Sequence, residues 1–90
     1  MLKIVSSNRF KKDLKLALRR GYRIELLEDV VNKLADGIAL EPKYKDHELS
    51  GDFKGLRECH ITPDWLLIYQ VIENELVLYL SRTGTHSDLF

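Results

Sequence analysis

The sequence predicts an α+β fold in which an N-terminal strand and a helical hairpin pack on a small antiparallel sheet, in the order β-α-α-β-β-β. Three observations favour this fold. Apolar residues recur at helical spacing in two neighbouring segments of the first half. Three strand-like runs follow one another closely in the second half. With 90 residues, the chain has enough length for one small core, so we expect a single domain over residues 1–90.

The first half begins with a short strand and continues as two helices. Residues 2–6 alternate briefly between apolar and polar types, as strands do. A helix follows from Arg9 and ends at Gly21, because glycine readily adopts the left-handed conformation found at helix C-termini. A second helix spans about 23–36 and ends at Gly37. The expected buried stripes are Phe10, Leu14, Ala17 and Leu18 in the first helix, and Ile24, Leu27, Val30, Val31 and Leu34 in the second.

A long loop and three strands make up the second half. Residues 38–55 are rich in charge and glycine, and loops of this length in compact domains tend to be functional. Strands are expected over 56–61, 65–72 and 75–81. Both alternating sets of the middle strand are apolar, so we expect it to be covered on both faces. The polar tail after residue 81 ends in two apolar residues, which predicts that it docks back on the domain.

The charge is unevenly distributed. Fourteen Lys and Arg balance fourteen Asp and Glu, yet residues 1–24 hold eight bases against Asp13 alone. The remaining residues therefore hold six bases and thirteen acids. A segment this basic suits a polyanion or an acidic protein partner, although a solvated helix face explains it equally well.

Several classes of protein are excluded. The longest apolar run, Trp65–Tyr69, is far shorter than the roughly 20 residues of a membrane helix, and the N-terminus lacks a signal-peptide pattern. One cysteine cannot form an internal disulfide, which indicates a soluble protein of a reducing, intracellular compartment. Cys59 shares a strand face with Ile61 and is expected to be a buried small hydrophobe, not a nucleophile. The histidine spacings lack the short paired intervals of structural zinc sites, so we expect no metal.

All three histidines lie in or beside loops of the second half. His47 is in the long loop, His60 is near a strand end, and His86 is in the tail, with carboxylates such as Glu58 and Asp64 nearby. Imidazoles, a carboxylate and an arginine suit phosphodiester cleavage without a metal. One group takes the proton of an attacking hydroxyl, another protonates the leaving oxygen, and a cation stabilises the charge that develops on the phosphoryl group.

Each of these side chains also has a structural explanation. A single histidine near a strand end is more often structural than catalytic. Arg57 and Arg82 can be sheet-edge charges, and Trp65 and Tyr69 are expected in the core. Phe90 either anchors the tail or stacks on a base.

Four segments in this order resemble the YafQ group of bacterial type II toxins, within the RelE/ParE superfamily. They are residues 44–49 (YKDHEL), 55–61 (GLRECHI), 63–69 (PDWLLIY) and 82–90 (RTGTHSDLF). Residues 1–43 agree with the group in length and element order. The resemblance implies a RelE-like fold and a ribosome-dependent endoribonuclease that cuts translated mRNA. Such toxins use the ribose 2′-hydroxyl as nucleophile and need no metal or other cofactor.

The resemblance also implies the catalytic residues, by position. His47 or His60, helped by Asp64, would act as base or orient the nucleophile. His86 is expected to be the general acid, and Arg82 is expected to stabilise the transition state. The motif does not decide which imidazole does which task, since coupled groups can share it.

Phe90 would position the substrate. Since the total charge is zero, the RNA- and ribosome-binding surface is expected on the basic first helix, at Lys11, Lys12, Lys15, Arg19 and Arg20. The resemblance further implies a cognate antitoxin, typically in a heterotetramer that binds operator DNA, in the bacterial cytoplasm.

Two other functions compete with the nuclease. A non-enzymatic ParE-like toxin of the same fold would inhibit DNA gyrase by binding, and an inactive module would only bind the antitoxin. A pure binder has no chemical need for three imidazoles and an arginine in these loops, so the sequence favours the enzyme.

Overall fold

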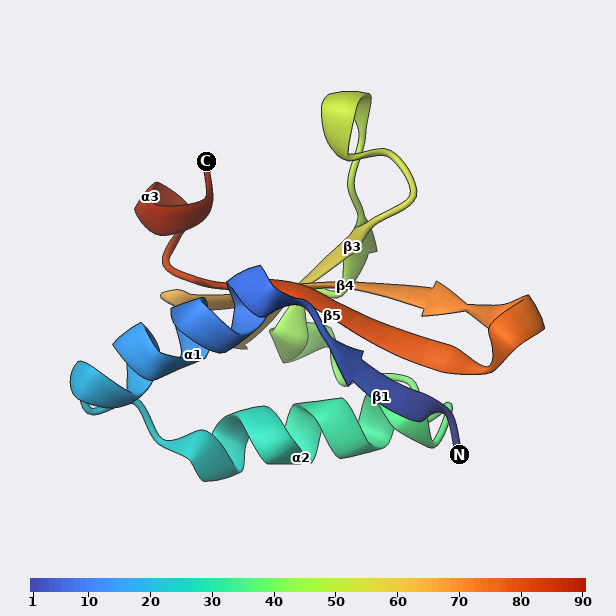
Figure 1. Cartoon of the computed structure of the whole chain (residues 1–90), viewed down its shortest axis with the longest axis horizontal. Coiled ribbons are helices and arrows are strands. Elements are labelled where there is room, and N and C mark those ends of the chain that lie inside the picture. The colour runs from blue at the N-terminus through green and yellow to red at the C-terminus, as the bar shows by residue number, and fades with distance from the viewer.

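The computed structural model describes residues 1–90 as a five-stranded sheet with two long helices on one face (Figure 1). The helical hairpin α1–α2 and the element order expected from the sequence are confirmed. The elements are β1 (Lys3–Ser6), α1 (Asn8–Arg19), α2 (Ile24–Ala35), η1 (Pro42–Tyr44), β2 (His47–Glu48), η2 (Gly51–Phe53), β3 (Arg57–Thr62), β4 (Trp65–Ile72), η3 (Glu73–Glu75), β5 (Val77–Gly84) and α3 (His86–Leu89).

The predicted antiparallel pairing of β3, β4 and β5 is confirmed, and the N-terminal strand β1 joins them in parallel, so that the whole sheet is mixed. Its strand order is β1-β5-β4-β3-β2, and β1 runs parallel to β5 whereas all other pairs are antiparallel. The partner of β1 is the last strand, more than seventy residues away in the chain. Alternation within a strand does not reveal such a distant pairing, which depends on how the whole chain is routed.

The helices end where the sequence predicted. Ser7 caps α1 by accepting a hydrogen bond from the backbone N–H of Phe10, and Gly21 follows the helix with a φ of 82°. One residue of the predicted stripe differs, because Leu18 is exposed. The face that α1 buries is narrower than expected and centres on Phe10 and Ala17.

The segments expected to be irregular contain short elements. The long loop holds η1, η2 and the two-residue strand β2, which pairs with the edge of β3. The tail forms α3, whose first turn is closed by a capping box between Thr85 and Asp88. Leu89 is buried, so the predicted docking of the tail is confirmed.

Strand β4 is covered on both faces, as predicted. Trp65, Leu67 and Tyr69 belong to the main core, which lies between the sheet and the two helices. Leu66 and Ile68 form a second cluster with Leu89 on the opposite face of the sheet. In Figure 1, α2 lies beneath the sheet, and α3 and the loop that carries η2 rise above it. No helix has the length and apolar character needed to cross a membrane.

Cys59 is fully buried, as expected. Burial raises the pKa of its thiol to about 12. At neutral pH the side chain therefore stays protonated and behaves as a small apolar group.

One buried polar pair ties the end of β5 to β4. The indole N–H of Trp65 donates to Thr83 Oγ1 at 2.8 Å, and the Thr83 hydroxyl donates to the Leu66 carbonyl at 2.7 Å.

The substitution Thr83→Val keeps the side-chain volume but leaves both hydrogen-bonding partners of Thr83 unpaired in the core. We expect a loss of about 1–3 kcal/mol in the free energy of unfolding, measured by urea denaturation. The half-buried Thr62 makes no side-chain hydrogen bond, and Thr62→Val should change stability by less than about 0.5 kcal/mol. Equal effects of the two changes would contradict the role given to Thr83.

Candidate active site

The pairing register places the predicted polar residues in a row across the face that carries α3. His47 of β2 is opposite Glu58 of β3, Glu58 is opposite Ile68 of β4, and Ile68 is opposite Arg82 of β5. Directly paired residues project to the same side of a sheet. The row therefore joins His47, Glu58 and Arg82 on one surface, and His60, two residues beyond Glu58, lies on it as well.

A bulge in β5 puts Arg82 on that surface. Tyr69 is paired with Leu80, but the next residue of β4, Ile68, is paired with Arg82, so that Ser81 is the extra residue. Without the extra residue, Arg82 would point into the core beneath the helices. The displaced Ser81 carbonyl accepts a hydrogen bond of 2.8 Å from the hydroxyl of Ser7, which joins the bulge to the start of α1.

Asp13 of α1 orients the Arg82 side chain. Its carboxylate accepts hydrogen bonds from Arg82 Nε at 2.7 Å and Nη2 at 3.2 Å, and a further one from the Thr83 backbone N–H at 3.2 Å. These bonds raise the pKa of Arg82 and occupy one edge of its guanidinium. The end edge, formed by Nη1 and the second N–H of Nη2, has no protein partner and can bind a phosphate. Sequence reasoning missed this role, although Asp13 is the only acid among the first 24 residues.

Glu58 lies between two of the predicted imidazoles. Its Oε1 is 3.6 Å from Nε2 of both His47 and His60, and its side chain is only 9% exposed. Nδ1 of His47 lies 2.7 Å from the carbonyl oxygen of Lys45. Because a carbonyl oxygen can only accept, Nδ1 is the donor of this hydrogen bond, and Nε2 of the neutral ring carries no proton. In the sequence, the spacing of Glu58 and His60 two residues apart on one strand already indicates that their side chains lie on the same face.

Asp46 fixes the loop that precedes β2. The hydroxyl of Tyr69 donates to Asp46 Oδ1 at 2.5 Å, and Arg57 Nη2 lies 3.4 Å from Asp46 Oδ2. Burial, followed by the contact with Asp46, raises the pKa of Tyr69, so its hydroxyl stays protonated as a donor. Because His47 follows Asp46 directly, this anchor also limits where the imidazole can lie.

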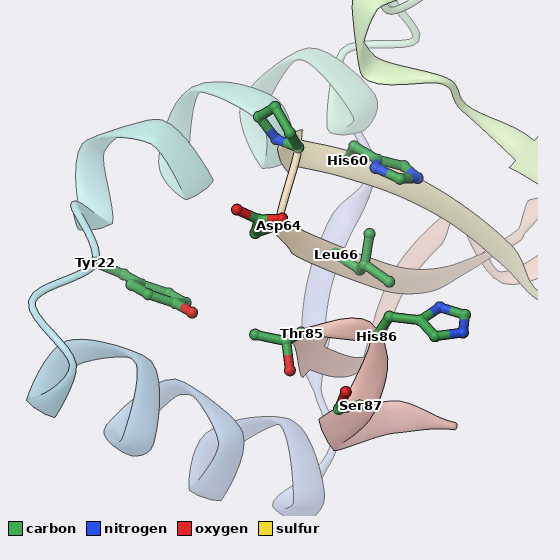
Figure 2. A pocket seen from close by; sticks show the side chains of 8 residues that line it. Tyr22, His60, Asp64, Leu66, Thr85, His86 and Ser87 are labelled. Carbon is green, nitrogen blue, oxygen red and sulfur yellow. The ribbon is translucent and has the colours of Figure 1, made fainter.

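An open pocket of about 520 Å³ joins the strand end to the tail. His60, Asp64 and His86 line it together with Tyr22, Pro63, Leu66, Thr85 and Ser87. Figure 2 shows the rings of His60 and His86 pointing to the same side, with Leu66 between them and Tyr22 across the pocket. The structure thus brings His86 of the tail together with His60 and Asp64 of the β3–β4 hairpin, from which it is far apart in the sequence. Tyr22, in the turn between the helices, gave no functional signal in the sequence.

Helix α3 is held in place at both ends. The Asp88 carboxylate accepts hydrogen bonds from Arg20 Nη1 at 2.6 Å, from Arg20 Nη2 at 3.2 Å and from the Thr85 backbone N–H at 2.9 Å. Leu89 packs on Leu66 and Ile68. The ring of Phe90, the last residue, lies 5.0 Å from the ring of His86.

The basic residues predicted to bind RNA do not behave alike. Lys11, Lys12, Lys15 and Arg19 are exposed on α1 and form no ion pair in the structure. Arg20 differs, because its guanidinium is engaged by Asp88 across the domain. Its first role is therefore to hold α3.

No group of three or more His, Cys, Asp and Glu side chains is arranged to hold a metal ion.

The mixed sheet carries a helical hairpin on one face, and imidazoles, an arginine and a C-terminal aromatic ring on the other. This is the arrangement expected of a RelE-like toxin. The family comparison agrees with it. The model described as "Bacterial toxin of type II toxin-antitoxin system, YafQ" matches residues 2–90. The chain belongs to the YafQ toxin family, and the resemblance inferred from residues 44–90 is confirmed over nearly its whole length.

Similar proteins extend this finding. The Escherichia coli K12 protein named "mRNA interferase toxin YafQ" is 40% identical over 85 residues, which cover 93% of this chain and 90% of that protein. This similarity confirms the expectation that the chain is an endoribonuclease of the mRNA interferase type. A metal-bound toxin from Helicobacter pylori is 50% identical, with a TM-score of 0.95 and full coverage of both chains. The toxin of the E. coli DinJ–YafQ complex is 38% identical, with a TM-score of 0.90 over 100% of this chain and 99% of that one.

The Arg20–Asp88 pair gives a test of how α3 is held. The Arg20 guanidinium, and then the Thr85 backbone, hold the pKa of Asp88 well below its usual range. A lowered pKa means that the pair stabilises docking at pH values above the ordinary carboxyl pKa of about 4, and that this stabilisation is lost only as the pH falls through the lowered value. In Arg20→Ala we expect the Asp88 pKa to rise toward its ordinary value, measured by NMR titration of the carboxyl carbon.

The matched control is Arg19→Ala, which removes an exposed arginine from the same turn. It should leave the Asp88 titration and the amide exchange of residues 86–90 unchanged, whereas Arg20→Ala should accelerate that exchange. An Asp88 pKa that is the same in both variants would show that the ion pair does not form in solution.

Proposed function

We propose that this chain is the toxin of a type II toxin–antitoxin system and cuts translated mRNA on the ribosome. The proposal rests on one observation above all. The strand register and the bulge in β5 gather His47, His60 and Arg82 on one face, next to the pocket that His86 lines. Two or three imidazoles around one arginine supply the acid, the base and the charge that phosphodiester cleavage needs.

The first step of the proposed reaction removes a proton from the ribose 2′-hydroxyl. Either His47 or His60 accepts this proton. The Nε2 atom of each ring lies 3.6 Å from the same oxygen of the Glu58 carboxylate. That carboxylate stabilises the imidazolium that forms, and its burial keeps this interaction less screened by water. Glu58 is thus a positioning group for both candidate bases.

The second part of the reaction breaks the bond to the leaving oxygen. The 2′-oxygen attacks the adjacent phosphorus, the bond from phosphorus to the 5′-oxygen breaks, and His86 donates a proton to that oxygen. The products are a 2′,3′-cyclic phosphate and a 5′-hydroxyl. Arg82 binds the non-bridging oxygens through its free end edge, where negative charge builds up. Asp64, on the wall of the same pocket, assists the candidate base or orients the ribose nucleophile.

Binding to the ribosome falls to the basic side of α1. Lys11, Lys12, Lys15 and Arg19 are free to contact phosphates, and phosphate contacts supply much of the affinity for nucleic acids. Phe90, 48% exposed beside His86, would contact the substrate.

The proposed partner is an antitoxin protein. The E. coli relative was solved as a complex of DinJ and YafQ, and we expect this chain to be silenced by an antitoxin of the same kind. We further propose a heterotetramer that binds operator DNA through the antitoxin, in the bacterial cytoplasm.

Induced expression of wild type, His86→Ala and Asn32→Ala tests the proposed function. Wild type should arrest growth and produce new mRNA ends, mapped by sequencing. His86→Ala should lower cleavage by about 100-fold or more, because a general acid contributes about 10²–10⁴ in rate. Asn32 is an exposed polar residue of α2 outside the pocket, so Asn32→Ala should behave like wild type.

Growth arrest that persists in His86→Ala without new mRNA ends would overturn the catalytic assignment. It would favour a toxin that inhibits gyrase by binding. Normal growth with the wild-type chain would instead indicate a module that only binds the antitoxin.

A further inference from the structure

Two exposed aromatic rings from distant parts of the chain meet beside His86. Phe53, at the end of η2, is 40% exposed, and Phe90 is 48% exposed. Their ring centroids are 5.3 Å apart with an interplanar angle of 77°, so the edge of one ring faces the other. The ring of Phe90 also lies 5.0 Å from the His86 imidazole, measured between ring centroids.

The same apolar cluster supports both rings. Leu49 and Leu56, at the two ends of the loop that carries Phe53, pack against the cluster of Leu66, Ile68 and Leu89. The backbone N–H of Leu49 donates to the carbonyl of Leu56 at 2.9 Å, which closes the loop. Because Leu89 directly precedes Phe90, the loop and the tail are fixed relative to each other.

The loop needs glycine to bring Phe53 back toward the tail. Gly51 and Gly55 flank the turn with φ values of 64° and 95°, in the left-handed region that other residues rarely adopt. The turn thus presents an aromatic side chain at its tip and leaves much of the ring in water.

An L-shaped pair of exposed rings matches the flat face of a nucleobase. A base that lies on one ring meets the edge of the other, and both contacts are favourable aromatic geometries. Proteins commonly hold single-stranded RNA by stacking unpaired bases on aromatic side chains, with little dependence on sequence.

We propose that Phe53 and Phe90 together form a stacking site for one unpaired base of the RNA next to the scissile phosphate. This inference rests on the proposed function for its substrate class and adds Phe53, a residue of the long loop, to the substrate-binding surface. The site is adjacent to the proposed general acid, since the Phe90 ring contacts His86 directly. A base held there fixes the ribose–phosphate backbone beside that imidazole.

A fluorescence titration of Phe53→Trp tests the site. The native Trp65 is buried, so the new tryptophan reports on the tip of the loop. A short single-stranded oligoribonucleotide with 2′-O-methyl groups, which cannot be cleaved, should quench it in a saturable manner. Adding Phe90→Ala should weaken this binding by about tenfold, the size expected from the loss of one stacking partner.

Two controls separate stacking from other effects. Ile38→Trp places a tryptophan at an exposed position after α2, away from the pocket, and should not be quenched. Ribose 5-phosphate, which has no base, should not quench Phe53→Trp. Absent quenching, equal quenching at Ile38→Trp, or an affinity unaffected by Phe90→Ala would each overturn the stacking site.

Cleavage of ribosome-bound mRNA distinguishes failure of this inference from failure of the proposed function. Phe53→Leu should raise KM by about tenfold with little change in kcat, whereas Phe53→Trp should retain the wild-type KM. If wild type cleaves and Phe53→Leu has an unchanged KM, the stacking site is wrong and the nuclease stands. If wild type does not cleave, the proposed function fails whatever the titration shows.

Discussion

The extra residue in β5 is the constraint on which the proposed site depends. Up to Leu80, β5 is bonded to β1 on one side and to β4 on the other. Beyond Leu80, β1 has ended, and α1 supplies the missing partners: Ser7 donates to the Ser81 carbonyl, and Asp13 accepts from the Thr83 N–H. These contacts hold the bulge, which turns Arg82 outward while Thr83 still packs inward against Trp65.

The same helix therefore serves both faces of the sheet. Phe10 and Ala17 of α1 enter the main core, while Asp13 and Arg20, seven residues apart and so on one side of the helix, reach over the sheet edge to Arg82 and Asp88. A helix that packs correctly thus also sets the orientation of Arg82 and the position of α3. In this fold, core formation and assembly of the site are coupled.

The sequence predicted what local pattern determines and missed what distant contacts determine. Helix ends at Gly21 and Gly37, the two-sided burial of β4 and the docking of the tail follow from periodicity and glycine preference. The parallel pairing of β1 with β5 and the bulge at Ser81 depend on residues far apart in the chain, so no local pattern reveals them. For the same reason the sequence could not show that Arg20, one of the residues expected to bind RNA, pairs with Asp88, which lies 68 residues away. The candidate catalytic residues were found because a family motif carries them, and their grouping on one face came from the register.

The chemistry of the new RNA ends shows directly which group attacks the scissile phosphate. We claim that the 2′-hydroxyl of the RNA is the nucleophile and that imidazoles move the protons. Purified toxin, translating ribosomes and a defined mRNA give products whose termini can be identified by mass spectrometry. We expect 5′-hydroxyl ends and 2′,3′-cyclic phosphates, or the 3′-phosphates formed when these open. Ends with a 5′-phosphate and a 3′-hydroxyl would show that water attacks the phosphorus, which would contradict the mechanism.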